Sequence, residues 1–231
     1  MAKLGKLIVI DGTDSSGKAT QTELLIKHLK RDGQKVKVVD FPDYYSSFFG
    51  KFIGHCLSEQ YYNFVKVHPK IASVLYAADR FESRDKIKKW LKDGNIVIAN
   101  RYASANQIHQ GGKIANTKKR ESFLKWLAEM EYEVFKIPKP DVIFYLSVPI
   151  PVVLKLIRER NKNNKRSYLG KKNDVHEKDI NFLENSRKTA LWLAKTQKGW
   201  IKIECVKNGM LDTRENIHQE IYEKIKKVLK E

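Results

Sequence analysis

Residues 7–20, LIVIDGTDSSGKAT, restrict the possible folds of this chain more than any other stretch. The first four residues are apolar and predict a short buried strand. Gly12 and Gly17 follow with four residues between them, and then come Lys18 and a helix-like run. A strand, a glycine-rich turn and a helix N-terminus form an anion site, because backbone N–H groups turn inward and the lysine reaches the outer phosphates. The stretch therefore predicts a phosphate-binding loop.

One position departs from the usual pattern of such a loop. A Ser or Thr ordinarily follows the lysine, and its hydroxyl binds Mg²⁺. Here Ala19 occupies that place, and the hydroxyl comes one residue later at Thr20. The alternative is a glycine-containing strand–helix turn with an incidental lysine. The flanking strand and helix patterns favour the phosphate site.

The size and composition of the chain indicate one soluble domain. Its 231 residues suffice for a substantial core, and 42% of them are hydrophobic. No apolar run approaches membrane-spanning length, and the N-terminus lacks a signal-peptide core. Cys56 and Cys205 lie far apart without metal-like spacing, which suits a reducing compartment. We therefore expect a cytoplasmic protein without membrane association.

The charge balance is strongly basic, with 45 Lys and Arg against 27 Asp and Glu, or +18. Such a surface attracts polyanions, so nucleic acid is one candidate partner. The lysines are spread through most of the predicted helices, however, rather than gathered in one block. We favour a solvated basic surface with positive potential around a nucleotide cleft, and expect no nucleic-acid partner.

Short apolar runs alternate with helical patterns along the chain. This alternation indicates a mostly parallel sheet covered on both faces. We expect a single three-layer, doubly wound α/β domain over residues 1–231, with five strands and ligands at their carboxyl ends. The predicted strands are Lys6–Ile10, Lys35–Phe41, Asn95–Asn100, Val142–Ser147 and Trp200–Cys205. The predicted helices are Ala19–Arg31, Ser46–Glu59, Lys70–Lys92, Lys118–Phe135, Ile150–Arg160, Glu177–Thr196 and Thr213–Lys230.

Several predicted strands end at polar groups. Asp11 follows the first strand, Asp43 comes shortly after the second, Arg101 follows the third and Ser147 ends the fourth. Because the carboxyl ends of parallel strands share one edge of the sheet, these groups are expected to converge on one site.

Tyr76 and Arg80 lie four residues apart within a predicted helix, which puts the ring and the guanidinium on one face. An aromatic ring can stack on a base, while an arginine can bind a phosphate through two hydrogen bonds. A core tyrosine beside a salt-bridged arginine is the alternative.

The segment 161–172, NKNNKRSYLGKK, is polar, basic and glycine-containing, and it follows Arg158 and Arg160. We interpret residues 158–176 as a lid that closes over phosphates and excludes water. An exposed, solvated loop is the alternative. The position of the segment, after the fourth strand and a short helix, favours the lid.

Together these motifs resemble those of thymidylate kinases, a family of nucleoside monophosphate kinases with a phosphate loop. The resemblance covers nearly the whole chain, and the order and spacing of the motifs carry it. The matching motifs are IDGTDSSGKATQ, DFP (Asp40–Pro42), LYAADR (Leu75–Arg80), NRYASANQIHQGG (Asn100–Gly112), KPDVIFYLSVP (Lys139–Pro149) and DVHE (Asp174–Glu177).

The resemblance implies transfer of the ATP γ-phosphoryl group to dTMP, with Mg²⁺, in a homodimer. It implies that Asp14 faces the sugar 3′-hydroxyl and that Tyr76 stacks on thymine. The residues it assigns to the donor phosphates are Gly12, Thr13, Asp14, Ser15, Ser16, Gly17, Lys18, Ala19 and Thr20. Those it assigns to the acceptor nucleotide are Asp14, Phe41, Tyr76, Arg80, Arg101, Asn106 and His109, with the two arginines at the acceptor phosphate and base region.

The resemblance also bears on the cation that stabilises the transition state. Some family members carry an arginine inside the phosphate loop, where this chain has the neutral Ser15. The charge must then come from the lid, and such an arginine is worth on the order of 10³–10⁵ in rate. The lid candidates are Arg158, Arg160, Lys165 and Arg166. We expect catalytic roles for Lys18, Arg101, Arg158 and Arg166.

Several positions depart from the family pattern. Asn100 and Ser147 stand where aspartates are expected, His109 replaces a tyrosine, and Ala19 lacks the metal-binding hydroxyl. The metal ligands therefore stay unassigned, and Asp11 is one candidate substitute. The alternatives are a kinase for another nucleoside monophosphate, a relative that binds nucleotides with weak catalysis, and a nucleic-acid-associated regulator.

Overall fold

The computed structural model describes residues 4–58, 64–163 and 179–230. Its centre is a five-stranded parallel sheet with the strand order β2-β3-β1-β4-β5. The strands are β1 (Leu7–Gly12), β2 (Val36–Asp40), β3 (Ile96–Asn100), β4 (Val142–Ser147) and β5 (Trp200–Glu204). The predicted sheet is confirmed, and each strand ends within two residues of its predicted range.

The first strand occupies the centre of the sheet, between β3 and β4. All six of its residues are buried, as expected for a parallel strand with helices on both faces. Side chains alternate along the strand, so Leu7 and Val9 enter one hydrophobic core, whereas Ile8 and Ile10 enter the other. The sheet therefore separates two cores and forms the middle layer.

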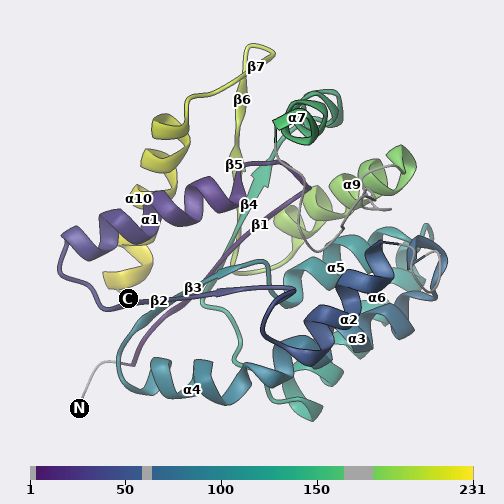
Figure 1. Ribbon diagram of the computed structural model, residues 1–231, viewed down its shortest axis with the longest axis horizontal. Coiled ribbons are helices and arrows are strands. Elements are labelled where there is room, and N and C mark those ends of the chain that lie inside the picture. Colours follow the sequence, from purple (N-terminus) through teal and green to yellow (C-terminus); the bar gives the residue numbers. More distant parts are fainter. Residues whose placement is uncertain (1–3, 59–63, 164–178, 231) are drawn as a thin grey trace.

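Helices cover both faces, which confirms the three-layer α/β fold. In Figure 1, α1 and α10 lie side by side on one face, while α2, α3, α5 and α6 gather on the other side. The helices near the amino end and middle of the chain are α1 (Lys18–Arg31), α2 (Phe48–Leu57), α3 (Pro69–Glu82), α4 (Arg84–Lys92), α5 (Ala103–Gly112) and α6 (Thr117–Ala128). Those nearer the carboxyl end are α7 (Ile150–Asn163), α9 (Ile180–Thr196) and α10 (Arg214–Lys230).

Two predicted helices are interrupted in the structure. The range 70–92 contains two helices, because Ser83 ends α3 and starts α4. The range 118–135 contains α6 and then η2 (Glu129–Val134), a π-helical turn. Apolar periodicity continues through both interruptions, so the pattern alone predicts one helix in each case. A short 3₁₀ turn, η1 (Phe64–Lys66), precedes α3.

Helix α5 and the small hairpin formed by β6 (Val206–Lys207) and β7 (Met210–Leu211) are absent from the predicted elements. The sequence of α5, ASANQIHQGG, has no apolar stripe, and its buried face is made largely of small and polar residues. Close packing compensates for this. A Cβ on Gly112 would lie 3.1 Å from the backbone nitrogen of Ser186 in α9. Tertiary contact, rather than local propensity, therefore specifies this helix.

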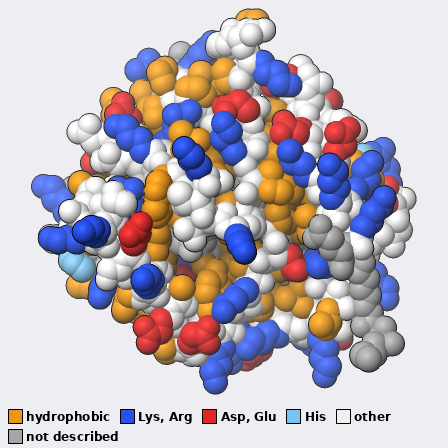
Figure 2. Space-filling view, turned by 180° about the vertical axis from the view of Figure 1, so that it is seen from behind, with side chains coloured by type: hydrophobic (Ala, Val, Ile, Leu, Met, Phe, Trp, Pro, Cys, Tyr) orange, Lys and Arg blue, Asp and Glu red, His pale blue; other side chains and the backbone are white. Residues whose placement is uncertain are grey.

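The surface keeps the scattered positive charge expected from the composition. Figure 2 shows Lys and Arg side chains spread over one face, among acidic and apolar ones. Among the described helices, none is both long and apolar enough to span a bilayer. Only the start of the predicted lid falls on described residues, at the end of α7, and Lys165 and Arg166 lie outside them.

Candidate active site

A cavity of about 710 Å³ opens where β1, β2 and β3 end. It is lined by residues from the phosphate loop, from the segment after β2, and from α3, α5, α7 and α10. All seven predicted acceptor residues line it, namely Asp14, Phe41, Tyr76, Arg80, Arg101, Asn106 and His109. The loop residues 14–20 line it too, whereas Gly12 and Thr13 do not.

The phosphate loop folds tightly around the start of α1. A Cβ on Gly12 would lie 2.4 Å from the Ser16 hydroxyl, and Gly17 adopts a φ of 90°, so both positions require glycine. The Lys18 ammonium donates to the carbonyls of Gly12 at 3.2 Å and Thr13 at 2.7 Å. The loop thus holds its cation at the edge of the cavity, where phosphate oxygens can replace the two carbonyls.

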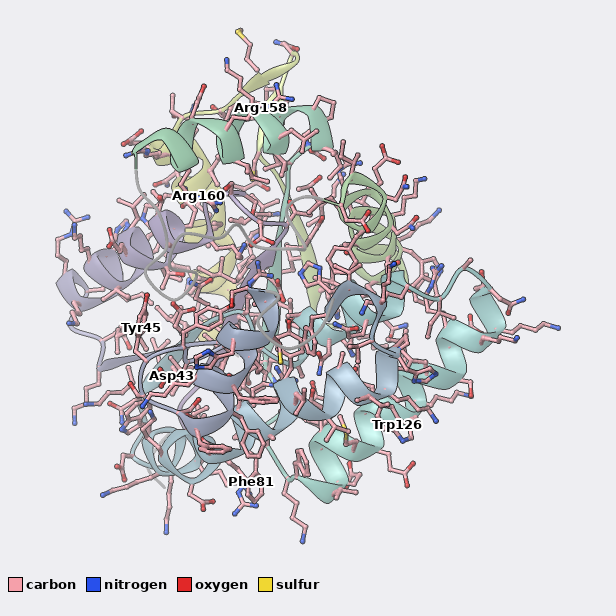
Figure 3. All side chains as sticks on the ribbon, turned by 45° about the vertical axis from the view of Figure 1, so that its right-hand side comes forward. Asp43, Tyr45, Phe81, Trp126, Arg158 and Arg160 are labelled. Atoms are coloured by element: carbon pink, nitrogen blue, oxygen red, sulfur yellow. The ribbon has the colours of Figure 1, made fainter. Side chains whose placement is uncertain are left out.

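An arginine from α7 reaches the tip of this loop. The Arg160 Nη1 donates to the Ser15 hydroxyl at 3.1 Å, at the position where the resemblance led us to expect a missing charge. Arg160 lines the cavity, whereas Arg158 is exposed and does not. In Figure 3, Arg160 lies below α7 on the side of α1, and Arg158 lies higher, at the helix itself. Of the two lid candidates that the structure describes, Arg158 and Arg160, Arg160 is the one at the loop.

Arg101 connects the phosphate loop to α5. It follows β3 with a φ of 65°, a left-handed conformation that turns its side chain back toward β1. Its Nη2 donates to Asp14 at 2.7 Å and its Nη1 to the His109 Nε2 at 2.9 Å. The His109 ring stacks on Phe182 of α9, and its Nδ1 lies 3.1 Å from the Ser186 hydroxyl. Three residues assigned to the acceptor sugar and phosphate therefore form one network.

A second network lies at the other side of the cavity. Arg80 of α3 is 2% exposed and donates through Nε and Nη2 to the two oxygens of Glu131, with the Nε bond at 3.0 Å. Asn106 of α5 donates through Nδ2 to the same carboxylate at 3.0 Å and to the Ser73 carbonyl at 3.1 Å. Burial alone lowers the pKa of Arg80, but the Glu131 charge and hydrogen bond outweigh it and raise that pKa.

Glu131 is absent from the sequence-predicted site. It is fully buried on η2, within a range that resembles no motif in the sequence. Glutamates also stand at positions 129 and 133, so nothing in the sequence singles out Glu131, and its partner could not be identified without the fold. The alternative interpretation of Arg80, a salt-bridged arginine, is thus correct for its ion pair, although the residue also lines the cavity.

Possible metal ligands lie where β2 and β3 end. Asp40 and Asn100 are paired across these strands, and both line the cavity. The Asn100 Oδ1 is buried and has no hydrogen-bond partner among the described residues. Burial by the cavity walls raises the pKa of Asp40, which remains accessible to water, and the charges of Arg101 and Lys18 offset this only in part. Carboxylate and amide oxygens suit Mg²⁺ together with phosphates and water.

Asp11, the substitute suggested by the sequence, does not fit this role. Its side chain is fully buried and lies outside the lining of the cavity. Its two oxygens accept from the Ser104 hydroxyl at 2.6 Å and from the Gly12 nitrogen at 2.8 Å. Within the described ranges, no group of three or more His, Cys, Asp or Glu side chains forms a metal cage. The described side chains therefore supply too few ligands to enclose a cation by themselves.

The comparison with known families agrees with this geometry. A family model described as thymidylate kinase matches residues 10–221. The chain belongs to the thymidylate kinase family. The thymidylate kinase of Plasmodium falciparum is 32% identical over 147 residues, which cover 64% of this chain and 63% of that protein. That of Thermosipho melanesiensis is 26% identical over 202 residues, or 87% of this chain and 90% of the relative.

A human thymidylate kinase is 29% identical over 150 residues, which cover 64% of this chain and 64% of that protein. Among solved structures, the thymidylate kinase of Candida albicans superposes with a TM-score of 0.72 at 21% identity, covering 97% of this chain and 92% of that one. This likeness supports the fold alone. The Candida structure is described as revealing the origin of broad substrate specificity, which is a property of the Candida protein.

Proposed function

We propose that this chain transfers the γ-phosphoryl group of ATP to dTMP, giving ADP and dTDP, with Mg²⁺. The cavity carries this proposal, because the phosphate loop and all seven acceptor residues face the same space. Phosphoryl transfer needs little covalent chemistry from the protein, and depends on positioning and on cations around the transferring group. The site supplies both.

Each cation has a distinct place. Lys18 exchanges its two loop carbonyls for donor phosphate oxygens. Arg101 binds the acceptor phosphate while Asp14 and His109 hold its guanidinium and face the sugar. Arg160 reaches the transferring group from above Ser15 and takes the part of the missing loop arginine. We therefore favour Arg160 over Arg158 as the lid cation, and Arg166 remains a prediction outside the described residues.

We assign the metal to the oxygen atoms of Asp40 and Asn100, with phosphates and water completing its shell. Bound there, Mg²⁺ neutralises charge on the phosphates. The carboxylate lost at position 100 is offset by one on the adjacent strand, since Asp40 and Asn100 are register partners. Ala19 lacks the usual metal-binding hydroxyl, so Asp40 and Asn100 supply the side-chain oxygens that we assign to the metal.

A coupled assay tests the acceptor. Purified protein is given ATP, Mg²⁺ and, separately, dTMP, dUMP, dCMP, dGMP and UMP, and ADP formation is followed. Fastest turnover with dTMP is the expected result. Fastest turnover with another nucleotide would show that this nucleotide, and not dTMP, is the preferred acceptor. ADP formation that does not depend on any acceptor would exclude a monophosphate kinase. ATP binding without turnover would indicate a nucleotide-binding relative.

We also propose that the chain forms a homodimer through α2 and α3 and resides in the cytoplasm. Five apolar side chains on these helices are exposed, at spacings that place them along the helix faces: Phe48, Phe52, Ile71, Val74 and Phe81. Contiguous exposed apolar patches of this kind mark interaction surfaces. The molar mass in solution, measured by light scattering, tests the dimer, and fractionation of the source cells tests the location.

A further inference from the structure

Glu131 occupies an unusual position for a residue with no assigned role. It is fully buried on η2, does not line the cavity, and receives hydrogen bonds from two side chains that do. These side chains come from different helices, Arg80 from α3 and Asn106 from α5. A buried carboxylate is costly unless it is paired, so its partners are held firmly to it. Glu131 thus controls what both partners can offer to a ligand.

The ion pair changes what Arg80 can bind. Nε and Nη2 of its guanidinium face the Glu131 carboxylate, which compensates the positive charge. A neutralised pair is a weak site for a phosphate group that carries two charges. The guanidinium keeps N–H groups on its opposite edge, since it has five in a rigid plane. Arg80 is therefore a directed hydrogen-bond donor for an uncharged acceptor, such as a carbonyl oxygen.

The same carboxylate fixes the amide of Asn106. Its Nδ2 carries two hydrogens, and both are used, one toward Glu131 and one toward the Ser73 carbonyl. A flipped amide would place Oδ1 against these two acceptors, where no hydrogen bond can form. The flip is thus disfavoured, and the group left for a ligand is the Oδ1 acceptor. Asn106 therefore receives a hydrogen bond from the ligand and has no donor to give.

We propose that Glu131 is a positioning residue for the base pocket, the part of the cavity lined by Tyr76, Arg80 and Asn106. It fixes which hydrogen-bond donor and which acceptor the pocket offers to a base. It presents one fixed donor, Arg80, and one fixed acceptor, Asn106. Thymine and uracil offer the matching pair, a carbonyl oxygen at C4 and an N–H at N3. Cytosine offers the reverse pair, an amino group at C4 and an unprotonated N3. The pocket therefore selects 4-oxopyrimidines, an inference that rests on the proposed acceptor and explains how it is chosen.

The discrimination this predicts is large, because a mismatched base leaves buried polar groups unpaired. Sites built to hydrogen-bond a substrate group reject analogues that lack it by factors of up to about 10⁴–10⁵. Two reversed contacts should give at least about 10² in kcat/KM between dTMP and 5-methyl-dCMP. These two nucleotides share the 5-methyl group and differ at C4 and N3, so size plays little part in the comparison.

The test uses Glu131→Gln, which keeps the shape of the side chain and removes its charge. The glutamine can donate as well as accept, so the Asn106 amide is free to turn. We expect kcat/KM for dTMP to fall. The ratio of kcat/KM for dTMP to kcat/KM for 5-methyl-dCMP should fall at least tenfold, while the KM for ATP is unchanged. Glu129→Gln is the matched control, because Glu129 lies on the same turn and is exposed.

Binding of thymidine and 5-methyldeoxycytidine, measured by calorimetry, gives a second readout that needs no phosphoryl transfer. The protein could lack kinase activity, still bind thymidine more tightly, and lose this preference in Glu131→Gln. That result would refute the proposed function and support the role of Glu131 in base selection. A merely structural role would weaken both ligands equally, and an unchanged ratio would overturn the inference. If Glu131→Gln does not fold, Asn106→Ala keeps the ion pair and should lower the same ratio. An unchanged ratio in that variant would also overturn it.

Discussion

The phosphate loop and the base pocket share one cavity but are built in opposite ways. In the loop, Lys18 bonds to carbonyls only five and six residues before it. In the base pocket, Arg80 and Glu131 are 51 residues apart, and Asn106 reaches across 25 residues to the same carboxylate. One side is a local motif, and the other is assembled by the fold.

The two regions also differ in how complete they are without a ligand. In the loop, the hydroxyls of Thr13 and Ser16 are buried and lack hydrogen-bond partners among the described residues. In the pocket, Arg80, Asn106 and Glu131 bond to one another. Buried polar groups are ordinarily satisfied, and Ser16 lines the cavity, so its hydroxyl is positioned for a phosphate to complete it. The Arg80, Asn106 and Glu131 side chains are already fixed, whereas the Tyr102 hydroxyl and the Gln110 Oε1 in the same lining also lack partners among the described residues.

The largest expected effect comes from Lys18→Ala, which removes the cation of the phosphate loop. Loss of one positioned donor to a developing charge costs about 10²–10³ in kcat. Lys18 donates to two loop carbonyls, which can turn to water in the variant, so we expect the melting temperature to change by no more than about 2 °C. Steady-state kinetics and thermal unfolding check both parts. Full activity in this variant would remove the phosphate-loop argument.

Substitution of the two α7 arginines tests which cation acts at the phosphate loop. Arg160→Ala should lower kcat by about 10², because the residue lines the cavity and contacts Ser15. Arg158→Ala, on the same helix but exposed and outside the lining, is the matched control and should stay within about twofold. Pre-steady-state measurement of the transfer step separates chemistry from product release. The reverse order of effects would restore Arg158 as the catalytic cation.

The contrast also explains what the sequence could reveal. The phosphate loop was predicted correctly as an element because fourteen adjacent residues contain its strand, turn and helix start. The lining residues Tyr76 and Arg80 follow from their helical spacing within one motif, LYAADR, and Asn106 follows from the resemblance of a second motif. Glu131 and Asp40 were not found as site residues, since their meaning depends on neighbours supplied by other elements. Helix α5 was missed for the same reason, because packing against α9 defines it.

Asp40→Asn tests whether the protein contributes to the metal site, with a smaller effect. Loss even of a residue that only orients a metal ligand lowers metal affinity by about 10–100-fold, and for the ligand Asp40 we expect about tenfold because phosphates and water hold most of the shell. Binding of Mn²⁺ to the ADP complex, followed by electron paramagnetic resonance, measures this directly.

Asp43→Asn is the matched control for that experiment. Asp43 lies three residues further along the chain, outside the cavity lining, and caps a turn by accepting from the Ser46 nitrogen at 3.0 Å. Figure 3 shows it beside Tyr45 on the segment after β2. Equal Mn²⁺ affinity in the wild type and Asp40→Asn would assign the metal to phosphates and water alone.

The smallest expected effect concerns pH and the support of the loop helix. His218 of α10 lies 2.9 Å from the ring nitrogen of His28 in α1, the helix that follows the phosphate loop. Burial, and then the charges of His28 and Arg31, lower the pKa of His218. The unfolded chain, with an ordinary value near 6.5, therefore binds more protons below that pH than the folded chain does. Stability should fall as the pH falls through about 6.5.

Urea unfolding between pH 5 and pH 8 isolates this contribution when the wild type is compared with His218→Gln. The wild type should lose more unfolding free energy than the variant below pH 6.5, whereas exposed His55, replaced in the same way, should leave the difference unchanged. Parallel curves for the wild type and His218→Gln would remove this contact as the cause. Since Lys18 begins the helix that His28 helps to anchor, ATP affinity should weaken over the same pH range before the base preference does.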